Sequence, residues 1–498
     1  MDVLVGVDLG TYSTKCVAIG SQGELVAQAS VPHELAVPQP GYAEQDAEAV
    51  WWQGLARGVR QLFAAGRFRP EWVRAVGVST TAPCVLPLDD EDRPLAPAIL
   101  YGIDVRAQAQ VRRLEAELQE AFLQEHCGQR LSSQAAGPKM LWVREVTPEV
   151  FARTRRMVGG TTYLVHRLTG RWWLDQYTAP GYAPFFDIPT ASWNRELIER
   201  YLGPGLRWPD IGWSTDVAGE VQAEAAAATG LARGTPVIVG TADAMAEAVS
   251  AAAVTPRHLF VMYGSSIFFI ATLTAPLRSP VFWIGPGLRS GTWALAGGMS
   301  TAGSLVKWCA QVQRHAGNDE DLFAEAAHSP PGSHGLLLLP YFSGERTPIL
   351  DPEARGAILG LSLSTTRGDL LRAALEGVAF GVRHNVEAIE QETGKLGSIV
   401  GAGGGVMGSL WPKIVSDVLG RAQRLMPGTS AAVGDALLAG AGVSLYPPSS
   451  LNDLAVRLAR PRWVEPDPRV RDLYDQRYAM FRDLYAVTRP LAHQLSRS

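Results

Sequence analysis

The amino-acid sequence predicts an α/β fold built from two large domains. A length of 498 residues exceeds what one hydrophobic core usually supports, which favours two domains. Strand-like and helix-like hydrophobic patterns alternate along the chain, as α/β proteins require. Residues 3–19 and 259–273 also repeat one local pattern, in which an apolar strand breaks into a turn of small polar residues and then resumes. We therefore expect the second copy of this pattern to open the second domain.

The domain boundary is predicted within residues 246–255, an alanine-rich stretch without glycine. The predicted domains are residues 1–246 and 247–498, with terminal helices over residues 465–498. Besides the strands of the repeated pattern, strands are expected at residues 75–78, 237–240, 292–296, 335–339 and 398–401, and helices at 47–65, 107–127, 139–145, 366–392 and 410–419.

Residues 259–277 form an uncharged segment that could be either a membrane-spanning helix or a pair of buried strands. They run for 19 residues without a charge, which is nominally enough to cross a bilayer. The segment nevertheless contains Gly264, Ser265, Ser266 and Pro276 among strand-forming residues. The pattern therefore predicts two buried strands, and no membrane partner is expected.

Charge and cysteine usage narrow the class of partner. A net charge of −4 supplies no bulk attraction for nucleic acid, so a small molecule is the expected partner.

Four scattered cysteines without a CxxC or Cys/His cluster argue against a structural zinc site and a disulfide framework. A reducing cytoplasm fits this usage. Because Met1 and Asp2 lead into a strand without a basic segment, we expect no signal peptide.

The two repeated turns are candidates for phosphate binding. Glycine with hydroxyl residues, as in Gly10 and Thr11 or Gly264 and Ser265, lets backbone N–H groups converge on an anion. Asp8 stands just before the first turn, where a carboxylate beside phosphates can hold Mg²⁺ or its waters. The pattern thus indicates a nucleoside triphosphate. The alternative is that both stretches are ordinary β-hairpins with glycine in their turns.

Asp243 is the candidate general base. It follows the strand predicted at residues 237–240, and open α/β sheets collect active residues at strand ends. A carboxylate there can take the proton of a hydroxyl that attacks a γ-phosphate. The alternative from local sequence is an N-cap for the alanine-rich helix that follows, and the two roles can coexist.

A third glycine cluster, at residues 401–409, leaves a second class of function open. Gly403, Gly405 and Gly408 satisfy the GxGxxG dinucleotide pattern, which is weak by itself. The acid expected about twenty residues later is missing, because Gln423, Arg424 and Leu425 stand there. The missing acid argues against NAD, but Arg424 could still be argued for NADP. An NADP oxidoreductase therefore remains a remote alternative.

Ordered motifs over nearly the whole chain resemble those of the FGGY carbohydrate kinase family, within the sugar kinase, Hsp70 and actin superfamily. The resemblance implies a two-lobed, ribonuclease H-like fold with two mixed sheets flanked by helices and a cleft between the lobes. It also implies ATP and Mg²⁺ as cofactors and an alcohol group as phosphoryl acceptor. The motifs are DLGT (8–11), GYAEQD (41–46), YGIDVRA (101–107), PKMLWV (138–143), RLTG (167–170), GTADA (240–244), GSS (264–266), GERTP (344–348), the run 354–380 and the glycine cluster.

The resemblance also implies roles for individual residues. Asp243 matches the catalytic base, and Asp8 would serve the magnesium ion and the reaction. The residues implied in binding ATP and its phosphates are Gly10, Thr11, Lys15, Gly264, Ser265, Gly303, Trp308, Gly404, Gly408 and Ser409. Homodimers are common in the family, so a homodimer is a possible assembly. No heptad or apolar stripe in this sequence predicts the interface.

The sequence departs from the family on the sugar side. Residues 79–84 read STTAPC, without the Gln and Met-His pair of xylulose-type kinases or the Arg-Glu pair of glycerol-type kinases. Ala244 stands where those relatives carry Asn or Gln, and Tyr101 replaces a Trp. The candidate sugar contacts are Thr80, Thr81, Asp104, Gln134 and Asp243, with Tyr12 as a wall of the cleft; Asp104 could instead simply pair with Arg106.

The leading hypothesis is an ATP-dependent kinase that phosphorylates a sugar or polyol, with a ketopentose such as xylulose as the first candidate. Asp8 and Asp243 are both present, which supports catalysis. The altered residues 79–84 and Ala244 motivate the alternative of a non-catalytic or regulatory nucleotide-binding protein of the same fold.

Overall fold

The structure is a computed structural model that describes residues 2–312 and 319–496, with backbone only for 319–321. The chain forms two compact units. Unit 1 contains the chain up to Pro256 together with Thr272–Ala294 and Thr429–Ala459. Unit 2 contains Arg257–Ala271, Leu295–Gly428 and the chain from Arg460 onward. Each unit therefore collects segments that are distant in sequence.

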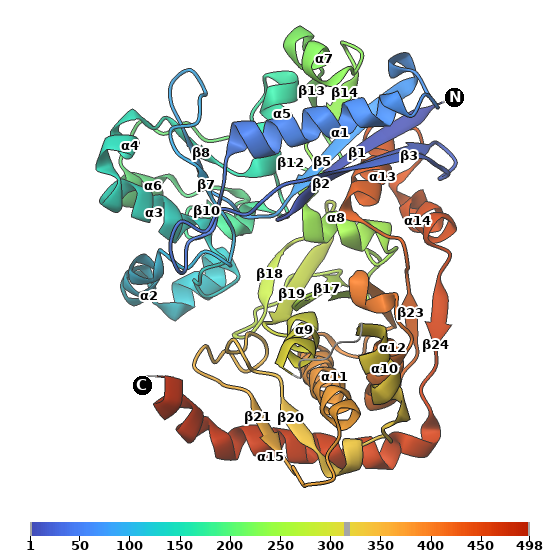
Figure 1. The fold of residues 1–498 in the computed structure, drawn as a ribbon. Coiled ribbons are helices and arrows are strands. Elements are labelled where there is room, and N and C mark those ends of the chain that lie inside the picture. The colour runs from blue at the N-terminus through green and yellow to red at the C-terminus, as the bar shows by residue number, and fades with distance from the viewer. Residues whose placement is uncertain (1, 313–318, 497–498) are drawn as a thin grey trace. The chain divides into compact units, whose positions relative to one another are not determined.

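Unit 1 is organised around a mixed sheet of order β13-β14-β5-β1-β2-β3, with β15 paired to β5 (Figure 1). β1 is antiparallel to β2 and parallel to β5. The strands are β1 (Val3–Leu9), β2 (Ser13–Gly20), β3 (Leu25–Pro32), β5 (Val73–Thr80), β13 (Val217–Glu220), β14 (Pro236–Ile238) and β15 (Thr241–Ala242).

The remaining elements of unit 1 flank this sheet or extend from it. The helices are α1 (Gln53–Ala64), α2 (Gln108–Phe122), α3 (Ala136–Val146), α4 (Pro148–Arg153), α5 (Gly160–Thr169), α6 (Arg195–Leu202), α7 (Ala223–Thr229), α8 (Asp243–Ser250), α13 (Ala431–Gly442) and α14 (Leu451–Ala459), with π-helical turns at Ala47–Trp52 and Leu123–Cys127. The shorter strands are β4 (Glu44–Gln45), β6 (Leu86–Leu88), β7 (Ala98–Ile99), β8 (Arg156–Val158), β9 (Trp173–Asp175), β10 (Phe186–Asp187), β11 (Ser192–Trp193), β12 (Asp210–Gly212) and β18 (Trp283–Pro286).

Unit 2 is organised around a second mixed sheet, whose full strand order is β18-β19-β17-β16-β22-β23-β24. β16 is antiparallel to β17 and parallel to β22. The strands are β16 (His258–Tyr263), β17 (Ile267–Leu273), β19 (Trp293–Met299), β22 (Ser398–Ala402), β23 (Gln423–Leu425) and β24 (Arg462–Val464), with a hairpin of β20 (Leu337–Leu339) and β21 (Ala357–Leu359). The helices are α9 (Gly303–Val312), α10 (Asp319–His328), α11 (Arg367–Thr393), α12 (Leu410–Leu419) and α15 (Arg471–Ser496).

The structure confirms the predicted strands and the helices expected at residues 47–65, 107–127, 139–145, 366–392 and 410–419, with small shifts at their ends. Both copies of the repeated pattern form antiparallel strand pairs, β1 with β2 and β16 with β17. The strand predicted at 237–240 already ends at Ile238, and the strand predicted at 335–339 begins at Leu337 because Ser333–Gly335 forms a 3₁₀ turn. No helix among the described residues has the length and apolar character to span a bilayer. The domain boundary near residue 246 stays a prediction.

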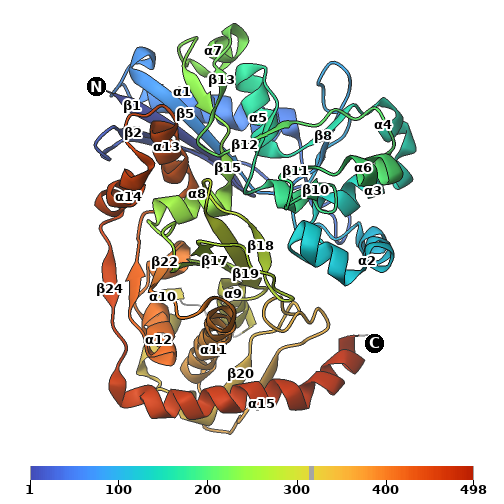
Figure 2. The same cartoon turned by 180° about the vertical axis from the view of Figure 1, so that it is seen from behind.

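A glycine-lined contact seats α13 on β1 and β5 in unit 1 (Figures 1 and 2). Side chains alternate between the two faces of a strand, so Val5 and Val7 join the α1 core while Gly6 faces α13. A Cβ at Gly6 would lie 1.8 Å from the Ala432 carbonyl oxygen, and one at Gly77 would lie 2.2 Å from that of Asp435. Backbone thus approaches backbone here, and only glycine permits the distance.

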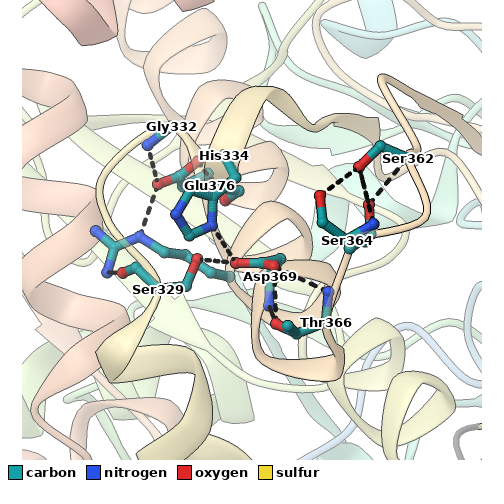
Figure 3. A network of polar contacts seen from close by, with 11 residues as sticks. Ser329, Gly332, His334, Ser362, Ser364, Thr366, Asp369 and Glu376 are labelled. Atoms are coloured by element: carbon teal, nitrogen blue, oxygen red, sulfur yellow. Dashed lines mark hydrogen bonds and ion pairs between the residues drawn. The ribbon is translucent and has the colours of Figure 1, made fainter.

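Unit 2 has a polar contact of a different kind at the start of α11 (Figure 3). Thr366 and Asp369 form a capping box, in which each side chain binds the backbone N–H of the other residue. The buried Asp369 carboxylate also accepts from the Ser329 hydroxyl (2.5 Å) and pairs with His334 (2.9 Å). Although burial opposes the charge, the hydrogen bonds from Ser329 and Thr366 hold the pKa of Asp369 well below its usual range.

We expect Asp369→Asn to destabilise the protein by about 1.5–3 kcal/mol at neutral pH, the usual effect of losing hydrogen bonds to a charged group. A carboxylate whose pKa is lowered on folding stabilises the protein above the pKa of the unfolded state. That stability is lost as the pH falls towards the folded-state pKa. Urea unfolding between pH 6 and pH 3 should therefore show the difference between wild type and variant shrinking with falling pH. A constant difference would contradict this account.

We expect Gly77→Ala to lower the free energy of unfolding by about 1–3 kcal/mol, as overpacking usually does. The added Cβ would overlap the Asp435 carbonyl oxygen, and the helix backbone cannot yield without moving α13. Gly397→Ala is a matched control, since its Cβ would meet no atom closer than 3.6 Å. Chemical denaturation of both variants checks the prediction, and equal stabilities would refute it.

Candidate active site

The first predicted phosphate turn lies between β1 and β2 in unit 1. The Gly10 N–H donates to the Ser13 carbonyl oxygen (3.0 Å), which closes the turn. The Gln45 amide donates to the Thr11 carbonyl oxygen (3.0 Å), while the Thr11 hydroxyl lies 3.4 Å from the Tyr101 hydroxyl. Lys15 follows on β2 with an exposed side chain. The turn is therefore held by side chains from outside it, and its hydroxyl and ammonium groups stay near solvent.

Asp8 is the buried carboxyl group beside this turn. It is 7% exposed, and its Oδ1 atom has no hydrogen-bond partner. Burial raises its pKa to about 6, and the positive charge of Lys15 and the Ser79 hydroxyl offset part of that rise. An unpartnered buried carboxylate oxygen is costly unless a cation or donor meets it. This supports the predicted position of Asp8 as a cation ligand.

Asp243 begins α8 directly after β15, which pairs with β5 beside Ser79 and Thr80. Ala242 occupies the N-cap position, so the N-cap alternative for Asp243 is wrong; its Oδ1 accepts from the Ala244 N–H (2.8 Å). Burial raises the pKa of the half-buried Asp243 well above its usual value, and the negative charge of Asp8 adds to the rise. Asp8 and Asp243 thus influence each other electrostatically, as expected for groups that share a site.

Two further acids, which the sequence did not point to, join this group. Glu247 lies one turn after Asp243 on α8, where burial and Asp8 raise its pKa to about 7. Asp435 on α13 is fully buried, and burial together with Asp8 and Asp243 raises its pKa well above the usual value. An acid inside the alanine-rich apolar helix α13 was the only signal that the sequence offered for Asp435.

Thr80 and Thr81, predicted to contact the sugar, are both buried at the end of β5. The Thr80 hydroxyl accepts from the Thr161 N–H (3.1 Å) and lies 3.2 Å from the Thr161 hydroxyl. The Thr81 hydroxyl lies 3.9 Å from the Cys84 sulfur. Thr80 therefore already serves to dock α5, and a sugar contact from either residue stays a prediction.

Asp104 is also occupied within the protein. Its carboxylate is fully buried and accepts from the Ala43 N–H (2.8 Å) and from the Arg106 guanidinium (2.7 Å), which also binds Glu44. The predicted alternative, a pair with Arg106, is confirmed. A direct sugar contact from this carboxylate stays a prediction.

Lys139 is a structural support that the sequence did not reveal. Its buried ammonium donates to the carbonyl oxygens of Leu100, Tyr101 and Ser133 at 2.7–2.8 Å, and burial lowers its pKa to about 8. The group ties the loop that carries Tyr101 to the segment that carries Gln134, which is half-buried. The loop geometry on the predicted sugar side therefore depends on one buried cation.

The second predicted phosphate turn lies in unit 2, between β16 and β17. The Gly303 N–H donates to the Gly264 carbonyl oxygen, and the Ser304 N–H donates to that of Ser265, both at 3.0 Å. A Cβ at Gly303 would lie 2.7 Å from the Gly264 oxygen. The start of α9 is thus bound to this turn, so two predicted nucleotide-binding segments lie together.

The third glycine cluster packs against the same strand end. Gly403 has a φ of +91°, and a Cβ there would lie 2.8 Å from the Tyr263 carbonyl oxygen. Gly404 and Gly408 face open space, since no atom lies within 4 Å of a Cβ built on either, and Ser409 is exposed. Trp308 is half exposed and packs edge-on against Phe342 at 4.8 Å. These exposed, small or flat groups suit an adenine ring.

The donor set in unit 1 fits Mg²⁺ but offers no closed metal cage. Among the residues that the structure describes, no three His, Cys, Asp or Glu side chains are grouped closely enough to bind a metal by themselves. Mg²⁺ usually takes one or two carboxylates and completes its shell with water and substrate phosphate. The unpartnered Oδ1 of Asp8 fits that pattern.

Known proteins resemble this chain over nearly its whole length. The models of the FGGY family of carbohydrate kinases match residues 3–250 for the N-terminal domain and 259–443 for the C-terminal domain. A xylulose kinase of Escherichia coli K12 is 29% identical over 491 residues, covering 98% of this chain and 99% of that protein. A glycerol kinase of Citrifermentans bemidjiense is 28% identical over 481 residues and 94% of each chain.

The solved structure of a xylulose kinase from Rhodospirillum rubrum is similar with a TM-score of 0.89 and 31% identity, covering 99% of this chain and 100% of that one. The predicted two-lobed fold of the actin and Hsp70 type, with two mixed sheets flanked by helices, is confirmed. The family models and these relatives are carbohydrate kinases, which is not the class of the remote oxidoreductase alternative. The chain belongs to the FGGY family of carbohydrate kinases, which are phosphotransferases with an alcohol group as acceptor.

Proposed function

We propose that this chain transfers the γ-phosphoryl group of ATP to a hydroxyl of a ketopentose, with xylulose as the first candidate. The observation that carries the proposal is the strand register around Ser79: β1 places Asp8 beside Ser79, and β15, which leads directly into Asp243, pairs with the same residue. Xylulose is favoured because proteins named xylulose kinase match the chain from end to end.

Asp243 is the proposed general base. Its raised pKa makes it a better proton acceptor than an ordinary aspartate once it is ionised. Its Oδ2 is left for the attacking hydroxyl, because the Ala244 N–H donates to Oδ1. Removal of the hydroxyl proton during the attack would increase the negative charge on the attacking oxygen in the transition state. The same contact would also position that oxygen for phosphoryl transfer.

The remaining site residues are proposed to bind and orient the substrates. In unit 1, Gly10, Thr11 and Lys15 would bind phosphate oxygens, and Asp8 would hold Mg²⁺, which neutralises phosphate charge during transfer. In unit 2, Gly264 and Ser265 would bind phosphates through the turn tied to α9. The proposed adenosine contacts are Gly303, Trp308, Gly404, Gly408 and Ser409.

The proposed sugar contacts differ in how free their polar groups are. Gln134 and Asp243 are half-buried and can reach a ligand, whereas Thr80 and Asp104 already hold internal partners. Tyr101 supplies a further hydroxyl near Thr11. We therefore expect Gln134 and Asp243 to contribute more to sugar recognition than Thr80, Thr81 and Asp104.

The cellular setting and the assembly are further parts of the proposal. All four cysteines are buried free thiols, which fits a reducing cytoplasm. We propose a small-molecule substrate without a nucleic-acid or membrane partner, and a homodimer as the assembly. Size-exclusion chromatography with light scattering would test the assembly.

We expect coupled ADP release with Mg-ATP to show a signal with ketopentoses in a panel that also holds ketohexoses, pentitols and glycerol. Asp243→Asn should lower kcat by about 10²–10⁴-fold, the usual contribution of general base catalysis, while calorimetry finds ATP binding intact. Asp472→Asn, an exposed aspartate in the first turn of α15, is the control. ATP binding without turnover of any sugar would favour a regulatory protein of the same fold.

The acid limb of the kcat/KM profile should report the ionisation of Asp243, with activity falling as the carboxylate takes up a proton. The charge of Lys15 lowers the pKa of Asp243 and of Asp8. Lys15→Met should therefore move the acid limb to higher pH, besides weakening ATP binding. Profiles of kcat/KM against pH at saturating ATP check this expectation. A shift of the acid limb to lower pH would contradict the proposed effect of the Lys15 charge on Asp243.

A further inference from the structure

Three residues on separate elements of unit 1 form a row that ends at Asp8. The parallel register of β1 and β5 places Asp8 opposite Ser79. The Ser79 hydroxyl donates to Asp435 Oδ2 on α13 at 2.7 Å, and both residues are fully buried. Ser79 also acts on the Asp8 carboxyl as a hydrogen-bonding group that lowers its pKa. The Ser79 hydroxyl thus lies between two carboxyl groups whose parent residues are 427 positions apart.

The strand geometry explains why this row forms. Alternation places Gly6 and Asp8 on one face of β1, and Gly77 and Ser79 on the corresponding face of β5. The two glycines admit the α13 backbone, because a Cβ at either position would collide with Ala432 or Asp435. Ser79, two positions after Gly77, then meets the Asp435 side chain. The close helix contact and the polar row are consequences of one arrangement.

A serine hydroxyl has one proton and can donate to only one carboxyl group at a time. Asp435 Oδ1 and Asp8 Oδ1 are both buried without a partner. In the structure the serine proton goes to Asp435 Oδ2, which fixes the Ser79 side chain beside Asp8 and leaves Asp8 Oδ1 to a cation.

We propose that Asp435 is a positioning residue which, through the Ser79 hydroxyl, fixes the Asp8 carboxylate in the orientation that holds Mg²⁺. The inference rests on the proposed function, because it takes Asp8 as the magnesium ligand. Partners that orient a metal ligand typically contribute about 10-fold to 100-fold in metal affinity. Asp435 itself does not touch the substrates and acts only through Ser79.

The test measures Mn²⁺ in place of Mg²⁺, by electron paramagnetic resonance of the full-length protein with ADP. We expect Asp435→Ala and Ser79→Ala to weaken Mn²⁺ binding about 10-fold or more, by loss of the orienting partner. Asp435→Asn should recover most of that loss, because its amide oxygen can accept from the Ser79 hydroxyl as Asp435 Oδ2 does. In turnover, the two alanine variants should lose kcat at an unchanged KM for the sugar.

Leu438→Ala is the matched control on the same helix. This buried side chain lies on α13, and its truncation should lower thermal stability while leaving Mn²⁺ affinity unchanged. If Asp435→Ala does not fold, Ser79→Ala carries the test, since it removes a single oxygen atom from the row.

The outcomes separate the two proposals. Wild-type Mn²⁺ affinity in both alanine variants would overturn the positioning role while leaving the kinase proposal intact. An Asp435→Asn variant as weak as Asp435→Ala would also overturn it, because the hydrogen bond to Ser79 would then not be what matters. If the wild-type protein binds neither Mn²⁺ nor ADP, the proposed function fails and the inference fails with it.

Discussion

The close approach of α13 to β1 and β5 is the contact on which the candidate catalytic half of unit 1 depends. Gly6 and Gly77 leave the strand surface bare, and Gly434 does the same for the helix, since a Cβ there would lie 1.8 Å from the Ala246 carbonyl oxygen of α8. The helix therefore lies against the sheet and against α8 at once. Because α8 begins with Asp243 and β1 carries Asp8, one packing constraint sets the positions of both acids.

The same packing places acidic side chains in surroundings that disfavour their charged forms. Asp8, Asp243, Glu247 and Asp435 are held in surroundings that raise the pKa of each, and for each of them burial is the leading cause. Lys15 is the opposing charge that acts on Asp8, Asp243 and Glu247. Such a cluster is stabilised by protons or by a cation. Raised pKa values in these acids fit the proposed function, in which Asp8 holds a divalent metal and Asp243 acts as the base.

Both units use one local device, a glycine-hydroxyl turn between antiparallel strands, but they secure it differently. In unit 1, side chains hold the turn, with Gln45 on the Thr11 carbonyl oxygen. In unit 2, backbone holds it, with the first N–H groups of α9 on Gly264 and Ser265. The first turn thereby keeps acids and a lysine around it, and the second lies among glycines that leave room for a flat ring.

The sequence by itself determined the fold class, the positions of most elements and the identities of Asp8 and Asp243 as site candidates. These signals are local, because strand alternation, glycine turns and a carboxylate at a strand end are each written within about ten residues. Only the tertiary structure decided that Asp435 meets Ser79, that Lys139 binds three loop carbonyl oxygens, and that Thr80 docks against Thr161. Those contacts join residues far apart in the chain, and they depend on how helices pack on a sheet, which no local pattern specifies.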